Sequence, residues 1–135
     1  MKCGPLLIAS ITAFLVSLEY AQAAASARDL LNDCQSLEVG KKGTGHLIKI
    51  PNTKEAFVCW GYMEAMQDLS VWVDENGHRI MGSCPSGQTT VLELIQAFVK
   101  YARSHRSQLQ ENAAVIVMMA FQEAFPCDQT VGPIG

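Results

Sequence analysis

The fold is decided by residues 90–105, which read TVLELIQAFVKYARSH. Thr90 is followed three residues later by Glu93, which is the capping-box pattern that starts a helix. After this start, apolar side chains recur at the spacing of three and four residues that places them on one helix face: Val91, Leu94, Ile95, Phe98, Tyr101 and Ala102. The stretch therefore predicts an amphipathic helix that begins at Thr90 and ends near His105.

The segment that follows predicts a helix that packs antiparallel against this one. Ser107 and Gln110 repeat the capping-box pattern, and the apolar pattern then continues to Phe125 before Pro126 ends it. Its apolar positions are Leu109, Ala113, Ile116, Val117, Ala120, Phe121 and Ala124. Because only a tight turn separates the two patterns, we expect a helical hairpin.

Another helix is expected over residues 26–37. Ser26 with Asp29 forms a capping box at its start, and Leu30 and Leu31 lie on a common apolar face. A glycine-rich polar segment follows this pattern, which indicates that the helix ends and a loop begins there.

The remaining helix is expected over residues 56–73. Asn52 with Glu55 forms the capping box before it, and Asp74 begins a polar turn after it. The apolar positions that recur at helical spacing are Phe57, Trp60, Met63, Ala65, Met66, Leu69 and Trp72. No stretch convincingly predicts a sheet, so the expected fold class is all-α, a small four-helix domain.

The first 25 residues have the composition of a cleaved signal peptide. Lys2 precedes an apolar run over residues 6–18, and small residues follow it over residues 21–25. We expect cleavage after Ala23 or Ala25, with Ala25 favoured, which leaves residues 26–135 as the mature helical domain. The apolar run is shorter than the roughly 20 residues that cross a bilayer, so no membrane span is expected.

The cysteines predict two disulfides. The chain has five cysteines, and Cys3 leaves with the signal peptide. An even set of four in a short exported chain is typical of crosslinks, whereas no pair has the CxxC spacing of a zinc knuckle. Sequence alone allows three pairings, but Cys84 and Cys127 flank the expected helical hairpin at the same end. We therefore predict Cys84 with Cys127, and Cys34 with Cys59.

The charge balance argues against a nucleic-acid partner. The chain carries a formal net charge of −3, and removal of residues 1–25 takes away one positive and one negative side chain. No lysine and arginine stripe is present that could neutralise several phosphates. The mild acidity is compatible with a basic protein partner.

A search for catalytic or metal-binding residues finds no convincing set. His46, His78 and His105 have neither an acidic residue nor a second histidine at the spacing of metal ligands. Residues 43–45, Gly-Thr-Gly, are not followed by the lysine-threonine pair of a phosphate-binding loop, and no strand precedes them. We expect no catalytic residues, no metal and no cofactor, which is the profile of a binding or inhibitory protein rather than an enzyme.

Several short motifs resemble the Tai/Rap-type immunity proteins of type VI secretion systems. They are the run CWGYMEAMQD over residues 59–68, Cys84-Pro85, Tyr101 with His105, and AFPC over residues 124–127. The resemblance rests on the order of these motifs along nearly the whole mature chain. The resemblance implies a small periplasmic helical protein with disulfides, often a homodimer, that binds and blocks a secreted peptidoglycan amidase effector.

A resemblance of this kind implies that a loop enters the effector's cleft and covers its catalytic cysteine and histidine. The two long irregular segments and the turn between the last two helices are where a rigid scaffold would present contacts. The candidate partner-binding residues in them are Lys41, Lys42, His78, Arg79, His105 and Arg106.

Two other functions remain open at this point. A periplasmic acid-stress chaperone of the HdeA-like kind is also small, helical and disulfide-bonded, and it would expose apolar surface on acidification. A small cell-wall hydrolase is the alternative from the enzyme class, and the missing catalytic or metal set disfavours it.

Overall fold

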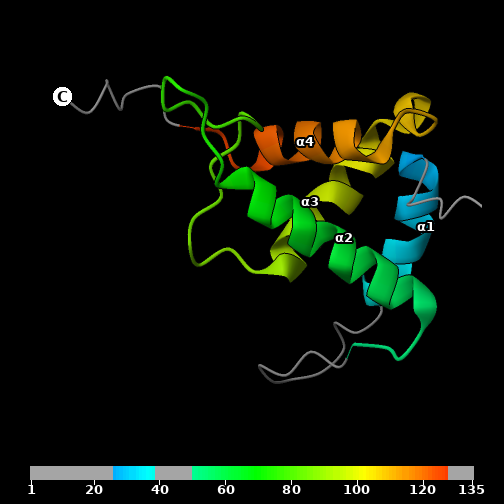
Figure 1. The fold of residues 1–135 in the computed structure, drawn as a ribbon. Coiled ribbons are helices and arrows are strands. Elements are labelled where there is room, and N and C mark those ends of the chain that lie inside the picture. Colours follow the sequence, from blue (N-terminus) through cyan, green and yellow to red (C-terminus); the bar gives the residue numbers. More distant parts are fainter. Residues whose placement is uncertain (1–25, 39–49, 128–135) are drawn as a thin grey trace, which may run out of the picture.

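Four α-helices and one short 3-10 helix form the protein over residues 26–38 and 50–127, which are the residues that the computed structural model describes (Figure 1). They are α1 (Ala27–Glu38), α2 (Lys54–Ser70), α3 (Val91–Ser104), η3 (Arg106–Gln108) and α4 (Ala113–Ala124). Helix α1 packs mainly against α2, and α3 packs against both α2 and α4. The predicted all-α, four-helix fold class is confirmed, whereas the expected signal peptide lies outside the described residues.

The starts of α1 and α3 agree with the sequence patterns. Thr90 Oγ1 accepts a hydrogen bond from the Glu93 N–H at 3.3 Å, and the Glu93 carboxylate accepts one from the Thr90 N–H at 2.7 Å. Ser26 Oγ accepts from the Asp29 N–H at 3.2 Å. These bonds satisfy amide groups that a helix start leaves without intrahelical partners.

The starts of α2 and α4 differ from the prediction. Thr53, not Asn52, caps α2, because its Oγ1 accepts from the Ala56 N–H at 3.2 Å. Asn112 caps α4 through a bond from the Ala114 N–H to its Oδ1 at 2.9 Å. The predicted capping box at Ser107 was therefore wrong.

The segment around Ser107 contacts the start of α1 instead of beginning α4. Residues 106–108 form η3, and the turn after it holds the beginning of α1. The Ala27 N–H donates to the Glu111 carbonyl and the Arg28 N–H to the Leu109 carbonyl, each at 2.9 Å. The α3–α4 connection thus satisfies the first amides of a helix that lies far away in the sequence.

The core lies between α1, α3 and α4, and α2 covers one side of it. The largest fully buried side chains come from all four helices: Leu30, Leu37, Met63, Leu94, Ile95, Phe98, Val99, Ile116, Val117 and Phe121. The predicted apolar face of α3 is confirmed. The predicted face of α2 was only partly right, because Met63 and Met66 are buried while Phe57, Leu69 and Trp72 are exposed.

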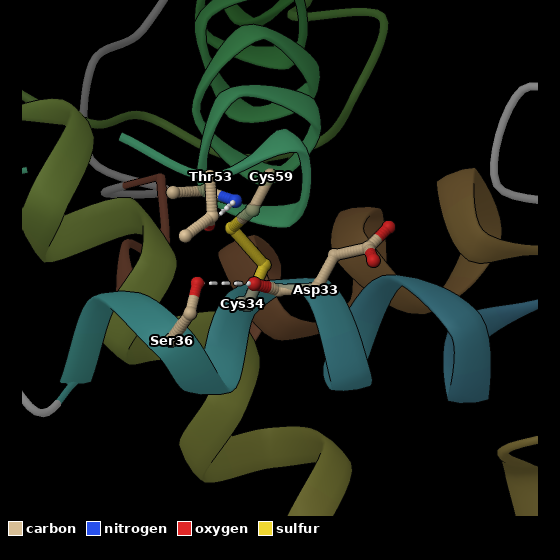
Figure 2. Close-up of a disulfide and its surroundings, with 6 residues drawn as sticks. Asp33, Cys34, Ser36, Thr53 and Cys59 are labelled. Carbon is tan, nitrogen blue, oxygen red and sulfur yellow. Dashed lines mark hydrogen bonds between the residues drawn. A yellow bond between two sulfur atoms is a disulfide. The ribbon is translucent and has the colours of Figure 1, made fainter. Parts of the chain in front are cut away.

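Both predicted disulfides are present. Cys34 bonds to Cys59 and joins α1 to α2, as Figure 2 shows, and Cys84 bonds to Cys127. The bonds join residues 25 and 43 positions apart. Restriction of the unfolded chain makes such closures worth about 3.5 and about 4 kcal/mol in the chain-entropy model. For one domain of this size, that is a large share of the net stability.

Candidate functional site

The connection between α2 and α3 contains a short antiparallel hairpin, residues 71–80. Val73 and Arg79 form a bridge, the Asp74 N–H donates to the His78 carbonyl at 2.8 Å, and the Ile80 N–H donates to the Trp72 carbonyl at 3.0 Å. Figure 1 shows this segment beyond the end of α2, near the end of α4. The hairpin is thus a projection from the helical body.

Polar atoms of the hairpin fix its own turn. Asp74 Oδ1 accepts from the Asn76 N–H at 2.8 Å and from the His78 N–H at 2.9 Å. Gly77 has a φ of 81°, in the left-handed region that favours glycine. The Arg79 guanidinium donates to the Val71 carbonyl. These contacts give the turn one defined conformation.

The same contacts change the acidity of Asp74. The hydrogen bond from the His78 backbone N–H is the largest cause that lowers the pKa of this carboxyl below its usual range, and the Asn76 N–H and the His78 ring add to it. The His78 Nδ1 lies 3.4 Å from Asp74 Oδ2. Asp74 is therefore ionised at any pH near neutrality.

The base of the hairpin is attached to the end of α4. Gln122 Nε2 donates to the Met81 carbonyl at 2.8 Å, and the Cys84 N–H donates to the Phe125 carbonyl at 2.8 Å. The Cys84–Cys127 disulfide crosslinks the same two segments. Because backbone, side-chain and covalent links coincide here, the hairpin cannot swing freely about its base.

Large apolar side chains are exposed on and beside the hairpin. Trp72 is 60% exposed and Ile80 58%, although both are apolar. We define the hairpin patch as the five exposed apolar residues Leu69, Val71, Trp72, Val73 and Ile80. Large apolar side chains that are exposed within one short segment are typical of a protein-binding region.

The sequence reasoning missed the hairpin patch because it placed Trp72 on the buried face of a longer helix. One feature of the sequence does indicate the hairpin. Residues 71–73 read Val-Trp-Val directly before the Asp-Glu-Asn-Gly turn, so helical spacing gives way to consecutive apolar residues. In extended backbone, successive side chains point to opposite faces. Consecutive apolar residues in a peripheral hairpin therefore cannot all face the core, and some of their side chains are exposed to solvent.

The predicted partner-binding residues do not form one cluster. His78 and Arg79 lie on the hairpin before α3, whereas His105 and Arg106 follow the last residue of α3. The 14 residues of α3, which span roughly 20 Å, lie between the two pairs along the chain. Lys41 and Lys42 lie outside the described residues.

His105 has a structural position at the end of α3. Its ring stacks on the Tyr101 ring with centroids 3.9 Å apart, and its Nδ1 lies 3.0 Å from the Tyr101 carbonyl. Ser104 Oγ lies 3.1 Å from the same nitrogen. The half-buried imidazole therefore helps to close the helix, which leaves Arg106 as the exposed candidate there.

The cysteines and the candidate metal ligands of the described residues can be placed in the structure. All four of their cysteines are disulfide-bonded, so none offers a thiolate. Within residues 26–38 and 50–127, no three histidine, cysteine or acidic side chains come close enough together to hold a metal ion. The feature that stands out is the fixed hairpin with its exposed apolar side chains.

Comparison with protein families matches residues 26–127 to the family described as Rap1a immunity proteins. Comparisons with curated proteins and with solved structures give no match. The matched range contains all four helices, both disulfides and the hairpin.

Proposed function

The chain belongs to the Rap1a immunity protein family, and from this premise we propose that it binds and inhibits a peptidoglycan amidase effector of a type VI secretion system. Membership makes it an immunity protein for a secreted effector. The amidase as target is supported by the motifs that resemble Tai/Rap-type proteins, from Cys59 to Cys127. Binding would protect the producing cell and its siblings from the toxin.

The periplasm is the proposed site of action. Two disulfides suit an oxidising compartment, and residues 1–25 have the composition of a cleaved signal peptide. No helix among the described residues has the length and apolar character needed to cross a membrane. We propose that the mature chain consists of residues 26–135. We also propose that it forms a homodimer, and light scattering of the purified protein would then give twice the mass of one chain.

The observation that carries the proposal is the family match over residues 26–127. The structure adds a physical means of inhibition, because a fixed projection with exposed apolar side chains can cover a partner's cleft without turnover. An inhibitor of this kind needs complementarity and a slow dissociation rate, not catalytic groups.

Calorimetry and a cell-wall digestion assay test the proposal together. The exported, oxidised protein is titrated into purified type VI amidase effectors, and release of peptidoglycan fragments is followed by chromatography. We expect tight binding with a fixed stoichiometry and loss of fragment release at the same molar ratio. Absence of binding, combined with protection of unrelated proteins from aggregation at low pH, would favour the acid-stress chaperone instead.

A further inference from the structure

We propose that one corner of the domain binds an anionic phospholipid surface. At this corner the last turn of α3, η3 and the start of α1 meet, and we define the basic end as its exposed cationic residues: Arg28, Lys100, Arg103 and Arg106. The inference goes beyond inhibition of an effector, because binding to lipid requires no effector. It rests on the proposed periplasmic site of action only in so far as an exported chain meets the lipid headgroups there.

Basic side chains are concentrated in the second half of α3 and in η3. Half of the lysines and arginines among the described residues lie within residues 100–106, and no aspartate or glutamate lies within residues 94–110. Lys100 and Arg103 are three positions apart on α3, so they are neighbours on its surface. Arg106 begins η3 directly after the helix ends. A chain with a net charge of −3 therefore carries a local excess of positive charge at this place.

The fold adds Arg28, which is distant in the sequence, to the same corner. Its N–H donates to the Leu109 carbonyl at 2.9 Å, and the side-chain oxygen of Gln110 accepts from its guanidinium Nε at 2.8 Å. These bonds hold the start of α1 beside the turn after η3, and Figure 1 shows the two segments together. Two acidic residues, Asp29 and Glu111, are close by in the chain and offset part of this charge, so most of the excess comes from α3 and η3.

The basic end lacks the apolar side chains that fill the centre of a protein interface. No large apolar side chain within residues 91–114 is exposed. The centre of a protein interface is usually apolar, whereas an anionic membrane surface attracts each nearby lysine or arginine separately and requires no fitted pocket. The composition of the basic end therefore favours a lipid surface over a protein partner.

The basic end and the hairpin lie at opposite ends of α4. The turn after η3 leads into Asn112, the N-cap of α4, and the base of the hairpin is bonded to Gln122 and Phe125 near its last residue. The 12 residues of α4 span about 18 Å, and Figure 1 shows η3 and the hairpin on opposite sides of this helix.

This separation has two consequences. It exceeds the screening length of about 10 Å at 0.1 M salt, so the acidic residues of the hairpin turn hardly weaken the attraction of the basic end to an anionic surface. A molecule held by its basic end also directs the hairpin away from the membrane, which leaves the exposed apolar side chains of the hairpin accessible to a protein partner.

Variants that remove charge from the basic end test the inference. Lys100→Gln removes one positive charge, and its combination with Arg106→Gln removes two. Lys54→Gln is the matched control, because Lys54 is also an exposed lysine and its loss changes the net charge equally. Lys54 begins α2, where it interacts with Asp33 and is not part of the basic end.

Sedimentation is measured with vesicles of phosphatidylglycerol and phosphatidylcholine in equal parts and with vesicles of phosphatidylcholine alone, and circular dichroism confirms that each variant is folded. We expect the unmodified protein to bind the anionic vesicles only, and to be released at high salt, because the screening length falls to about 3 Å at 1 M. At low salt Lys100→Gln should weaken binding about fivefold and the double variant about 25-fold, which corresponds to the attraction of one and of two cationic side chains. Lys54→Gln should stay within about twofold of the unmodified protein.

Trp72 reports the orientation of the bound molecule. Brominated lipids quench a tryptophan that enters the bilayer, and Trp60→Phe leaves Trp72 as the only tryptophan. We expect no quenching when this protein binds anionic vesicles that contain brominated lipid. Quenching would show that the apolar side chains of the hairpin contact the membrane in place of the basic end, and it would overturn the inference.

Four other results would overturn it. Failure to bind anionic vesicles removes the inference directly, and equal binding to neutral vesicles would show that the attraction is not electrostatic. An equal loss of binding in Lys54→Gln would assign the effect to the overall charge. If the basic-end variants keep vesicle binding and lose binding to a purified amidase effector, the basic end is a contact for the effector.

The proposed function is tested separately, because inhibition of the amidase is measured without vesicles. A protein that blocks the amidase but binds no anionic vesicles leaves the proposed function standing and removes the lipid inference. A protein that binds the vesicles through its basic end but blocks no amidase has the opposite meaning.

Discussion

Ser70 and Ser83 are the buried polar residues of the described chain, and they differ in how their hydroxyl groups are satisfied. Ser70 Oγ donates to the Gln67 carbonyl at 2.6 Å near the end of α2. Ser83 Oγ has no hydrogen-bond partner within residues 26–38 and 50–127, although its residue lies in the bridge to Pro126 beside the Cys84–Cys127 bond. A buried hydroxyl without a partner costs free energy, whereas a bonded one contributes about 1 kcal/mol.

We therefore predict opposite effects for two equivalent substitutions. Ser83→Ala should raise the free energy of unfolding by about 1 kcal/mol, because it removes an unsatisfied buried hydroxyl. Ser70→Ala should lower it by about 1 kcal/mol, because it removes a buried hydrogen bond. Urea unfolding of the oxidised protein measures both values, and a loss of stability in Ser83→Ala would contradict the assignment.

Protonation of the Asp74 carboxylate should weaken the turn of the hairpin, and this requires strong acid. The hydrogen bond from the His78 backbone N–H is the main cause that lowers its pKa below the ordinary aspartate value of 3.8. A carboxylate with a lowered folded-state pKa contributes stability that is present above the unfolded-state pKa and is lost as pH falls through the folded-state value. The order of the turn should therefore persist through mild acid and weaken below about pH 3.8.

The fluorescence of Trp72 reports this transition. Trp60→Phe leaves Trp72 as the only tryptophan, since the chain has two. We expect its emission to stay constant from pH 7 to about pH 4 and to change below that. In Asp74→Asn the emission should already be altered at pH 7, and a transition near pH 6 in the Trp60→Phe protein would contradict the role given to Asp74.

At the scale of the elements, α3 and the hairpin show what sequence patterns can and cannot predict. The apolar period of α3 coincides with its buried face because α1, α2 and α4 all pack against it. The four cysteines could be paired correctly because Cys84 and Cys127 flank the α3–α4 hairpin. Fold class and crosslinks thus follow from local periodicity and from the order of elements.

Other features depend on long-range contacts that local patterns do not contain. Helix α2 is covered on one side only, so Phe57 and Leu69 keep helical spacing but remain exposed. The predicted start of α4 was wrong because carbonyl groups within residues 106–111 accept hydrogen bonds from the first amides of α1. The hairpin patch was missed for the same reason, since only the tertiary structure shows that nothing among the described residues covers Trp72.

The two disulfides should differ in their reactivity toward a thiol reductant. Cys84 is exposed, whereas Cys34 and Cys59 are completely buried. Because thiol–disulfide exchange requires access to a sulfur atom, mild reduction should open Cys84–Cys127 first. Alkylation of the partly reduced protein followed by peptide mass spectrometry should find label on Cys84 and Cys127. The same treatment in denaturant should label all four, and equal labelling in the native protein would contradict the difference in access.

At the scale of the whole molecule, one end of a crosslinked helical body carries the hairpin. The Cys84–Cys127 bond and the Gln122 contact tie that end to α4, and the Cys34–Cys59 bond ties α1 to α2 on the other side of the domain. A scaffold of this kind lets one exposed segment act as a preformed ligand. We therefore predict that protection depends on export, on oxidation and on the hairpin.

Protection of cells from the effector tests the central claim most directly. The amidase is directed to the periplasm of a host bacterium, and lysis is recorded with and without the full-length protein. We predict that the full-length protein prevents lysis, whereas a form without residues 1–25, which stays in the cytoplasm, does not. Lysis that proceeds unchanged while the oxidised protein accumulates in the periplasm would contradict the account.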